Sequence, residues 1–331
     1  MEARKPTLED VGRLAGVSRA TVSRVVTNGR TVSTTTGRRV WWAIDALGYE
    51  PDLVARALAK RRGRADLVDL VVIDHDPSAF GTNPYYSRAV VGVLDALSNT
   101  GARMRVHIVD EPGAPARLEE VARTTGFGAL LVNVPPVLAG RFHARCDRVV
   151  SLGVSARGVP FIEPENADGA RAAYHHLYQT GRRHIAAIHG PQRNSCASGR
   201  RRGFLAAADE VGMAVIGIEG GFCREAGAAA TRQLLAEHPK VDAIFAACDL
   251  TATGVLQAVG EDGRRVPDDI AVVGFDDSVL AACATPALTS VRQPVEHIAA
   301  SATRALLAGD TARGWQRIVP TDLRVRRSTA A

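Results

Sequence analysis

Two short apolar stripes at helical spacing, separated by a glycine, mark the beginning of the chain. Their apolar positions are Leu8, Val11, Leu14 and Ala15 in the first stripe and Val22, Val25 and Val26 in the second. Residues three and four apart share one face of a helix, so each segment is expected to bury one face. Gly16 lies between the segments and suits a tight turn. Two short helices joined by such a turn form the helix-turn-helix pattern.

Small polar residues stand where these helices are expected to begin. Thr7 and Asp10 have the spacing of a capping box, and Ser18 can cap the second helix through its hydroxyl oxygen. The face opposite the valines carries Arg19, Ala20, Ser23 and Arg24. Guanidinium groups on such a face can bond guanine in the major groove. The alternative is an ordinary helical hairpin at a domain edge.

A third helix is expected at residues 34–47, with Ser33 as its cap and Gly48 after its end. The apolar residues that can close a three-helix core are Val40, Trp41, Ile44 and Leu47. Trp42 either covers the edge of that core, which we favour, or touches the DNA backbone.

A two-turn helix at residues 53–59 can follow Pro51, with Asp52 as its cap. Such a short helix is marginal by itself in water, and its Leu58 has no local core to cover. Two interpretations are evenly balanced: a helix that becomes ordered only against DNA and a second copy of the chain, or a plain interdomain linker.

From residue 67 onward, apolar runs of strand length alternate with helical segments. Strands are expected at residues 67–73, 104–109, 128–132, 149–152, 184–188, 241–246 and 270–275, and helices at 90–97, 118–123, 167–180, 199–211, 225–237 and 251–259. This alternation predicts an α/β fold with parallel sheets covered on both faces. The alternation restarts after Glu165, which predicts two lobes with a cleft at the carboxyl ends of their strands.

The two parts of the chain differ in net charge. Residues 1–64 hold 13 Lys or Arg and 6 Asp or Glu, a net charge of +7, whereas the whole chain of 331 residues carries +6. The remainder is therefore nearly neutral, at −1. A basic segment joined to a neutral domain indicates nucleic-acid binding. A solubility or membrane-contact tail is disfavoured, because apolar residues at helical spacing interrupt the charges.

Several other classes of protein are disfavoured. The five cysteines are odd in number and form no C-x-x-C pair, which suits a reducing cytoplasm. No signal peptide precedes Thr7, and no apolar run reaches the ~18 residues of a membrane span. Glycine-rich phosphate loops, hydrolase motifs and metal-ligand spacings are absent from the sequence, so we expect no enzyme, cofactor or metal site. The basic segment also speaks against a secreted solute receptor.

Six motifs of the first 60 residues point to one family. They are Thr7-Leu8-Glu9-Asp10-Val11, Ala15-Gly16-Val17-Ser18, Ala20-Thr21-Val22-Ser23-Arg24-Val25, Val32-Ser33, Leu47-Gly48-Tyr49 and Pro51 followed by Val54-Ala55-Arg56-Ala57-Leu58. In this order and spacing they resemble the DNA-binding head of the lactose/galactose repressor family (LacI/GalR) of bacterial transcriptional regulators. Gly12 departs from the usual Ala of the first helix, as does Thr35-Thr36 from a more charged start of the third.

The resemblance implies how the head contacts DNA. Arg19, Ala20 and Arg24 would face base edges, and Leu58 would wedge into the minor groove from a hinge helix. The full set of implied DNA-binding residues is Thr7, Ser18, Arg19, Ala20, Thr21, Ser23, Arg24, Ser33, Tyr49, Ala55 and Leu58.

Further motifs of this family extend the resemblance over nearly the whole chain. They are Thr180-Gly181-Arg182-Arg183-His184-Ile185, Gly190-Pro191, Arg200-Arg201-Arg202-Gly203-Phe204, Pro267 to Asp277 and Pro286 to Pro294. The implied architecture is a head at residues 1–50, a hinge helix and linker at 51–65, and a periplasmic-binding-protein-like domain at 66–331 that binds effector and dimerises. Its first lobe would hold about 66–164 and 294–322, and its second lobe about 165–293 and 323–331.

Nine residues are implied at the effector by their positions in these motifs. They are Tyr85, Tyr86, Asn194, Cys196, Arg200, Phe222, Cys248, Asp276 and Gln293. Arg200 would donate to ligand oxygens, Asp276 would accept from hydroxyls and Phe222 would stack, a combination that suits a sugar. The alternatives are that Arg200 belongs to a solvent-exposed run of arginines and that Phe222 is part of the hydrophobic core.

The sequence departs from the family pattern at several positions, so it determines the fold more closely than the identity of the effector. Gly153 and Glu165 differ from the usual residues, and the thiols Cys196 and Cys248 replace hydrogen-bonding groups. An alternative is therefore a redox or metal sensor built on Cys196, Cys223 and Cys248, although buried free cysteine is usually a small hydrophobe.

The expected protein is a cytoplasmic repressor that binds a palindromic operator as a homodimer and leaves it when a small effector, such as a sugar, binds. The chain end lacks a leucine heptad, which favours a dimer over a tetramer.

Overall fold

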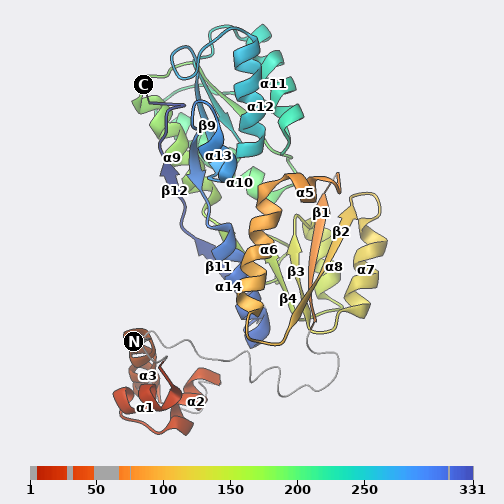
Figure 1. The fold of residues 1–331 in the computed structure, drawn as a ribbon, viewed down its shortest axis with the longest axis vertical. Coiled ribbons are helices and arrows are strands. Elements are labelled where there is room, and N and C mark those ends of the chain that lie inside the picture. Colours follow the sequence, from red (N-terminus) through yellow and green to blue (C-terminus); the bar gives the residue numbers. More distant parts are fainter. Residues whose placement is uncertain (1–5, 28–32, 48–66, 75, 312–313, 331) are drawn as a thin grey trace. The chain divides into compact units, whose positions relative to one another are not determined.

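The computed structural model describes residues 6–27, 33–47, 67–74, 76–311 and 314–330. The chain divides into two compact units, Met1–Gly63 and Arg64–Ala331. Figure 1 shows the first as a small group of helices and the second as two sheets flanked by helices. Each unit is described by itself below.

Within its described residues, 6–27 and 33–47, the first unit holds three helices: α1 (Leu8–Ala15), α2 (Arg19–Thr27) and α3 (Thr34–Leu47). The expected capping box is confirmed: Thr7 Oγ1 accepts from the Asp10 amide at 3.3 Å, and Asp10 Oδ2 accepts from the Thr7 amide at 2.9 Å. Ser18 Oγ accepts from the Thr21 amide at 3.2 Å, as its predicted capping role requires. Local hydrogen bonds thus fix where α1 and α2 begin.

Small aliphatic side chains form the core of this unit. The buried members are Val11, Ala15, Val22, Val25, Val40, Ala43 and Ile44. Two predictions about this core are wrong: Leu14 is 42% exposed and Trp42 is 59% exposed. Each residue of a helix turns the chain by ~100°, so two residues turn it by about half a circle. Trp42 therefore lies on the opposite side of α3 from Val40 and Ile44.

Several predictions lie outside the described residues. They concern Gly48, Tyr49, Ala55, Leu58 and the expected hinge helix, together with the side chains of Val26 and Trp41.

In the part of the second unit that the structure describes, the strands form two six-stranded sheets. The first has the order β11-β5-β4-β3-β1-β2, and all its neighbouring strands are parallel. Its strands are β1 (Leu67–Asp74), β2 (Arg103–Asp110), β3 (Gly128–Val132), β4 (Val149–Leu152), β5 (Phe161–Pro164) and β11 (Gln316–Val319). The register pairs Leu67 with Arg103 and Val68 with Gly128.

The second sheet has the order β12-β10-β9-β8-β6-β7. Its strands are β6 (Ile185–His189), β7 (Ile216–Glu219), β8 (Ala243–Ala246), β9 (Ala271–Asp276), β10 (Thr289–Arg292) and β12 (Asp322–Arg324). The short edge strand β12 runs antiparallel to β10, an exception to the predicted parallel pairing.

Helices cover both faces of each sheet, as the alternating pattern predicts. They are α5 (Ala79–Thr82), α6 (Pro84–Leu97), α7 (Ala114–Thr124), α8 (Pro136–His143) and α14 (Val295–Ala308) around the first sheet, and α9 (Asn166–Gln179), α10 (Ser195–Glu210), α11 (Arg224–Glu237), α12 (Asp249–Glu261) and α13 (Val279–Cys283) around the second. In the first lobe α6 packs beside α14 (Figure 1), and α7 and α8 cover the other face. In the second lobe, α9 and α10 share one core, and α11 and α12 share the other.

Three connections join the lobes: from β5 to α9, from β10 to α14 and from β11 to β12. The last connection lies slightly earlier than expected, because Asp322 belongs to β12 of the second sheet and not to the first lobe.

Two helices at the cleft begin earlier than the apolar pattern predicts, as does α7, which begins at Ala114 instead of residue 118. α6 begins at Pro84 instead of residue 90, because the Asn83 side chain accepts from the Tyr85 amide at 3.0 Å and proline suits the first helical turn. α10 begins at Ser195 instead of residue 199, where Asn194 caps it through a 3.1 Å bond from the Ala197 amide. Both helix starts, one from each lobe, lie at the cleft.

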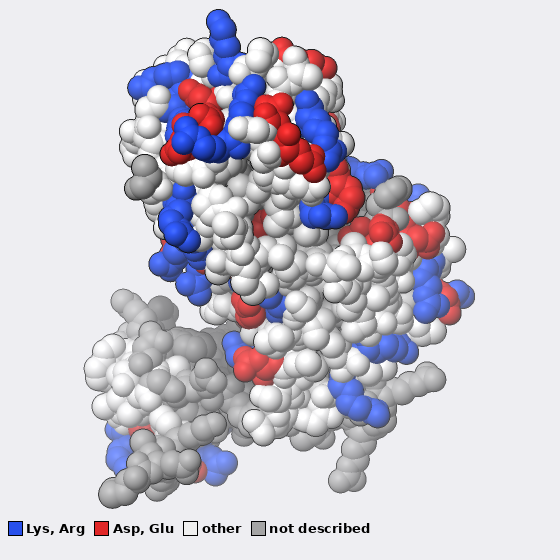
Figure 2. Space-filling view, turned by 45° about the horizontal axis from the view of Figure 1, so that its top comes forward, with Lys and Arg blue, Asp and Glu red and all other residues white. Residues whose placement is uncertain are grey.

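Acidic and basic side chains are interspersed over the upper part of the larger unit in Figure 2. This mixture agrees with the near-neutral charge of the sequence after residue 64. Within the described ranges, the structure contains no helix with the length and apolar character needed to cross a membrane.

Candidate functional site

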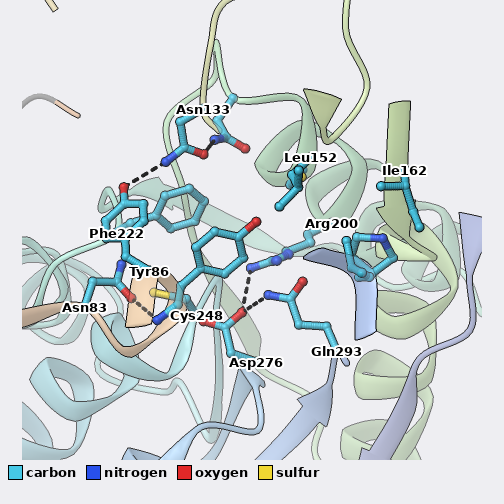
Figure 3. A pocket seen from close by; sticks show the side chains of 15 residues that line it. Asn83, Tyr86, Asn133, Leu152, Ile162, Arg200, Phe222, Cys248, Asp276 and Gln293 are labelled. Carbon is cyan, nitrogen blue, oxygen red and sulfur yellow. Dashed lines mark hydrogen bonds and ion pairs between the residues drawn. The ribbon is translucent and has the colours of Figure 1, made fainter. Parts of the chain in front are cut away.

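A cavity between the two lobes brings together all nine residues expected at the effector (Figure 3). Its volume is about 50 Å³, and its full lining is Asn83, Tyr85, Tyr86, Asn133, Leu152, Ile162, Pro164, Asn194, Cys196, Arg200, Phe222, Cys248, Asp276, Gln293 and Ile298. A larger outer cleft of about 800 Å³ adjoins it and shares the walls formed by Asn133, Leu152, Asn194, Cys196 and Phe222. The inner cavity is thus the deep end of a wider opening.

Arg200 enters the cavity from α10 and is only 4% exposed. Its Nε donates to Asn166 Oδ1 at 3.0 Å and its Nη1 donates to the Ala247 carbonyl at 2.5 Å. The guanidinium lies 3.7 Å from the Phe275 ring centroid, in cation–π geometry. Arg201 next to it is instead paired with Glu219 on the surface, so the two arginines do not form one solvated face.

Asp276 ends β9 beside Arg200, with its Oδ1 3.6 Å from Arg200 Nη1. Gln293 Nε2 donates to the same oxygen. Burial raises the pKa of Asp276, and Arg200, Gln293 and Arg88 oppose that rise. Among the described residues, Asp276 Oδ2 and Arg200 Nη2 make no hydrogen bond to protein. One acceptor and one donor group are therefore free for a ligand.

A second carboxylate, Asp249, lies behind Asp276 and is fully buried. It accepts from the Ser278 amide at 2.7 Å, from Ser278 Oγ at 2.9 Å and from Ser290 Oγ at 2.5 Å. Burial and the neighbouring Asp276 raise the pKa of Asp249 to about 7. The cavity therefore rests on two interacting buried acids.

The mouth of the cavity carries a chain of hydrogen bonds between the lobes. Tyr86 donates to Asp74 and accepts from Asn133 Nδ2 at 2.9 Å, and Asn133 Oδ1 accepts from Asn194 Nδ2 at 3.0 Å (Figure 3). Nearby, Arg193 Nη2 lies 2.7 Å from Glu111. These contacts hold the lobes together along this side of the cleft.

The two cavity thiols are poorly suited to redox chemistry. Burial raises the pKa of Cys196, and burial with the Asp276 charge raises the pKa of Cys248 to about 12. Reactive cysteines have lowered pKa values instead. Cys248 Sγ caps α12 by accepting from the Thr251 amide at 3.4 Å. Among the described residues, no group of three or more His, Cys, Asp or Glu is arranged to hold a metal ion.

Gly153 explains one departure from the family pattern. Its φ of 120° is rare for residues with side chains, and a Cβ there would lie 3.2 Å from Cys196 Sγ. An acidic residue at this position would therefore be strained and would press on the thiol.

Sequence reasoning missed several residues of the site. They are the lining residues Asn83, Asn133, Leu152, Ile162, Pro164 and Ile298, and the buried Asn166 that holds Arg200. The Asn83-Pro84 pair and the position of Asn133 directly after a strand were available signals, because ligands bind at the carboxyl ends of parallel strands. The apolar members carry no comparable signal.

The other candidate site is the outer face of α2 in the first unit. Arg19, Ala20 and Arg24 are exposed there, whereas Thr21 and Ser23 are partly buried. Arg19 Nη1 lies 3.1 Å from Glu9 of α1, so this guanidinium has a partner in the absence of DNA. Thr7 and Ser33 lie at helix starts, where Ser33 Oγ accepts from the Thr36 amide at 3.3 Å.

The turn before α2 is held by a residue that sequence reasoning did not identify. Arg39 Nη2 of α3 donates to the Ala15 carbonyl at 2.5 Å and to the Gly16 carbonyl at 3.3 Å. Gly16 has φ 63°, and a Cβ there would lie 2.6 Å from that nitrogen. This left-handed backbone conformation favours glycine at the turn. The backbone at Gly12 also packs closely against this turn, since an added Cβ would lie 2.8 Å from the Val17 carbonyl oxygen.

Comparisons with known proteins match both units of the chain. A family described as "Bacterial regulatory proteins, lacI family" matches residues 7–52, and one described as "Periplasmic binding protein-like domain" matches residues 174–329. The HTH-type transcriptional regulator CelR of Thermobifida fusca is 37% identical over 348 residues, which cover 98% of each chain. The ribose operon repressor of Halalkalibacterium halodurans is 32% identical over 343 residues, covering 98% of this chain and 97% of its own.

Solved structures give the same result. The CelR–cellobiose complex has a TM-score of 0.73 at 34% identity, with 98% of this chain and 99% of its own covered. The lac repressor dimer bound to operator and the anti-inducer ONPF has a TM-score of 0.73 at 28% identity, with 99% and 100% covered. A helix-turn-helix unit joined to a two-lobed binding domain defines a ligand-responsive transcriptional regulator. The chain belongs to the lacI family of bacterial regulatory proteins.

Proposed function

We propose that this regulator is a repressor whose release from DNA is triggered by a sugar bound between its lobes. The observation that carries the proposal is the cavity itself, in which Arg200 and Asp276 keep one donor group and one acceptor atom free beside the Phe222 ring. Neighbouring sugar hydroxyls both donate and accept hydrogen bonds, and the C–H face of a sugar packs on an aromatic ring. We expect no catalytic activity.

We further propose that the effector is a disaccharide. The inner cavity is small, and it adjoins an outer cleft whose walls carry Asp74 and Glu111 from the first lobe and Arg193 and Arg224 from the second. We propose that the lobes part to admit one ring at the inner cavity, while a second ring extends into this polar cleft. CelR, to which this chain is similar, has been solved as a complex with cellobiose.

The proposed DNA partner is a palindromic operator bound by a homodimer. Two heads related by a two-fold axis read two half-sites, and the related lac repressor structure is a dimer on its operator. An uncovered apolar face supports a partner copy: Val91 is 58% exposed and Leu94 50% exposed on α6, and Ile108 is 41% exposed on the edge strand β2 that α6 contacts. Because its proposed partner is chromosomal DNA, we place the protein in the cytoplasm.

The proposed residue roles follow from the resemblance of the sequence motifs to those of the lacI family. Arg19, Ala20 and Arg24 would read bases, and Thr7, Ser18, Ser23 and Ser33 would contact phosphates; Thr21, Tyr49, Ala55 and Leu58 complete the proposed DNA-binding set. The nine expected cavity residues would contact the effector. A ligand shifts DNA affinity only if it binds the two lobe arrangements with different affinity.

Isothermal titration calorimetry of the full-length protein tests the effector proposal. Cellobiose, glucose and ribose are titrated separately into the wild type and into Asp276→Asn. We expect cellobiose to bind more tightly than either monosaccharide and Asp276→Asn to lose most of that affinity. Absence of binding by all three sugars, or equal binding by wild type and variant, would count against a sugar in this cavity.

A further inference from the structure

Arg88 connects the first lobe to the backbone of Asp276, the carboxylate residue of the cavity in the second lobe. It lies one turn into α6, and its side chain is only 17% exposed. Its Nη1 donates to the backbone carbonyl of Asp276 at 2.9 Å, and its Nη2 donates to the carbonyl of Gln293 at 3.1 Å. Both carbonyls belong to cavity residues, one at the end of β9 and the other at a connection between the lobes. One side chain therefore bonds the backbone of two cavity residues.

Glu296 fixes the direction of this arginine. Arg88 Nε donates to Glu296 Oε1 at 2.6 Å and Arg88 Nη2 donates to Glu296 Oε2 at 2.9 Å, a two-point ion pair between α6 and α14. The planar fork of arginine suits such a pair. Gly92, one turn further along α6, lets the helices meet closely, since a Cβ there would lie 2.2 Å from the Glu296 carbonyl oxygen.

Asp276 needs a restraint of this kind. Its φ is 117°, a backbone conformation that residues with side chains rarely adopt, and Asp277 follows with φ 47°. Such strain persists only where the surroundings hold it. The Asp277 amide donates to Ser290 Oγ at 3.0 Å from within the second lobe. The bond from Arg88 to the Asp276 carbonyl comes from the first lobe, so the strained residue is held from both lobes.

We propose that Arg88 is a positioning residue that holds Asp276 in its strained conformation and thereby ties the second lobe to the first across the cavity. Loss of this tie lets β9 and the following connection relax, which moves the Asp276 carboxylate and opens the cavity. The tie is independent of what the cavity binds. Its effect on sugar affinity rests on the proposed function.

A buried thiol reports the opening without any ligand. Cys248 lines the cavity and is 4% exposed, whereas Cys146 lies in the first lobe, away from the cavity, and is half-buried. Iodoacetamide labelling of the full-length dimer, followed by peptide mass spectrometry, gives both rates in one sample. For Arg88→Gln we expect the Cys248 rate to rise about tenfold or more relative to Cys146, because a charged donor to two carbonyls is lost.

The matched control is Arg304→Gln. Arg304 of α14 also donates across to α6, to Asp95 at 2.9 Å, but both side chains are exposed and neither lines the cavity. We expect Arg304→Gln to leave the ratio of the two labelling rates unchanged. If Arg88→Gln fails to fold, Glu296→Gln decides the question, because it leaves Arg88 in place but removes its restraint; we expect a smaller rise in the ratio.

Cellobiose titration of the same variants supplies the ligand readout. We expect Arg88→Gln to bind cellobiose about tenfold more weakly than wild type or Arg304→Gln, with an unchanged melting temperature of the first unit. An unchanged labelling ratio in Arg88→Gln, or an equal rise in Arg304→Gln, overturns the tie. If the wild type does not bind cellobiose, the result counts against the sugar proposal alone. The labelling ratio still decides the role of Arg88.

Discussion

The three-helix unit and the cavity of the two-lobed unit place their charges in opposite ways. On α2, Arg19 and Arg24 are exposed, and the backbone beneath them is fixed by caps such as Ser18. In the cavity, Arg200 and Asp276 are buried and are held by other buried groups. The side chains that we propose to bind DNA are in water, whereas those that we propose to bind the effector are buried.

This difference decides what a substitution changes. An exposed recognition arginine can be removed with little effect on folding, since surface charges contribute little to stability. Removal of one partner from a buried pair leaves the other charge without compensation. Binding and stability should therefore separate in the first unit and change together in the cavity.

The largest effect is expected from Arg200→Met. It leaves Asp276 buried without its cation and should lower the free energy of unfolding of the second unit by about 3–5 kcal/mol. Sugar response should disappear as well. Arg201→Met is the control, because its partner Glu219 is on the surface, and it should cost less than about 1 kcal/mol. Urea unfolding of both variants measures the difference; equal losses would contradict the account.

Arg24→Ala should affect DNA binding alone. Loss of a two-point contact with guanine lowers specific affinity by about 1–3 kcal/mol, and the melting temperature should not change. Arg13→Ala serves as a control, since Arg13 is an exposed arginine of α1 that pairs with Asp10. Fluorescence anisotropy with specific and random duplexes measures both variants. A fall in affinity for random DNA as large as for specific DNA would argue against base reading by Arg24.

Thr7→Ala should have a smaller effect on the first unit. It removes the hydroxyl half of the capping box, which stabilises helix starts by about 1 kcal/mol. Amide hydrogen exchange in the full-length chain should then quicken in α1 and stay unchanged in α9. Unchanged protection of α1 would mean that packing alone maintains that helix.

The last prediction concerns the pH dependence of stability, which is followed over a pH range instead of as a loss at one pH. The folded-state pKa of Asp249 is about 7, whereas an unfolded Asp titrates near ~4. Between these values the folded protein binds more protons than the unfolded chain, so Asp249 contributes increasing stability as the pH falls from about 7 to about 4. Relative to Asp249→Asn, the wild type should therefore gain stability over this range in thermal unfolding. Parallel curves for both proteins would mean that Asp249 stays ionised.

The sequence was most informative where a local rule fixes the structure. The capping box at Thr7, the cap at Ser18 and most strands of the sheets follow from short patterns that do not depend on distant residues. The start of α6 does not follow from apolar periodicity, because the Asn83 cap and Pro84 set it before the apolar stripe begins.

The family motifs predict nine of the residues that line the cavity. The other contacts of the cavity join residues that are distant in sequence. Asn133 meets Asn194, and Arg88 meets Asp276, only after three connections have brought the lobes together. The strained φ of Asp276 cannot be read from an ordinary aspartate in an apolar strand. Trp42 shows that an apolar residue within a helix can remain exposed, although its residue type predicts that it packs against the core.

One measurement tests the central claim that a sugar in the cavity governs DNA binding by the first unit. Full-length protein is used to select duplexes from a randomised library, and the selected duplex is titrated at physiological salt with and without cellobiose. The account predicts an inverted-repeat sequence bound more tightly than random duplex, and at least about tenfold weaker binding once cellobiose occupies the cavity. No preference over random duplex in either state, or tighter binding with cellobiose, would contradict it.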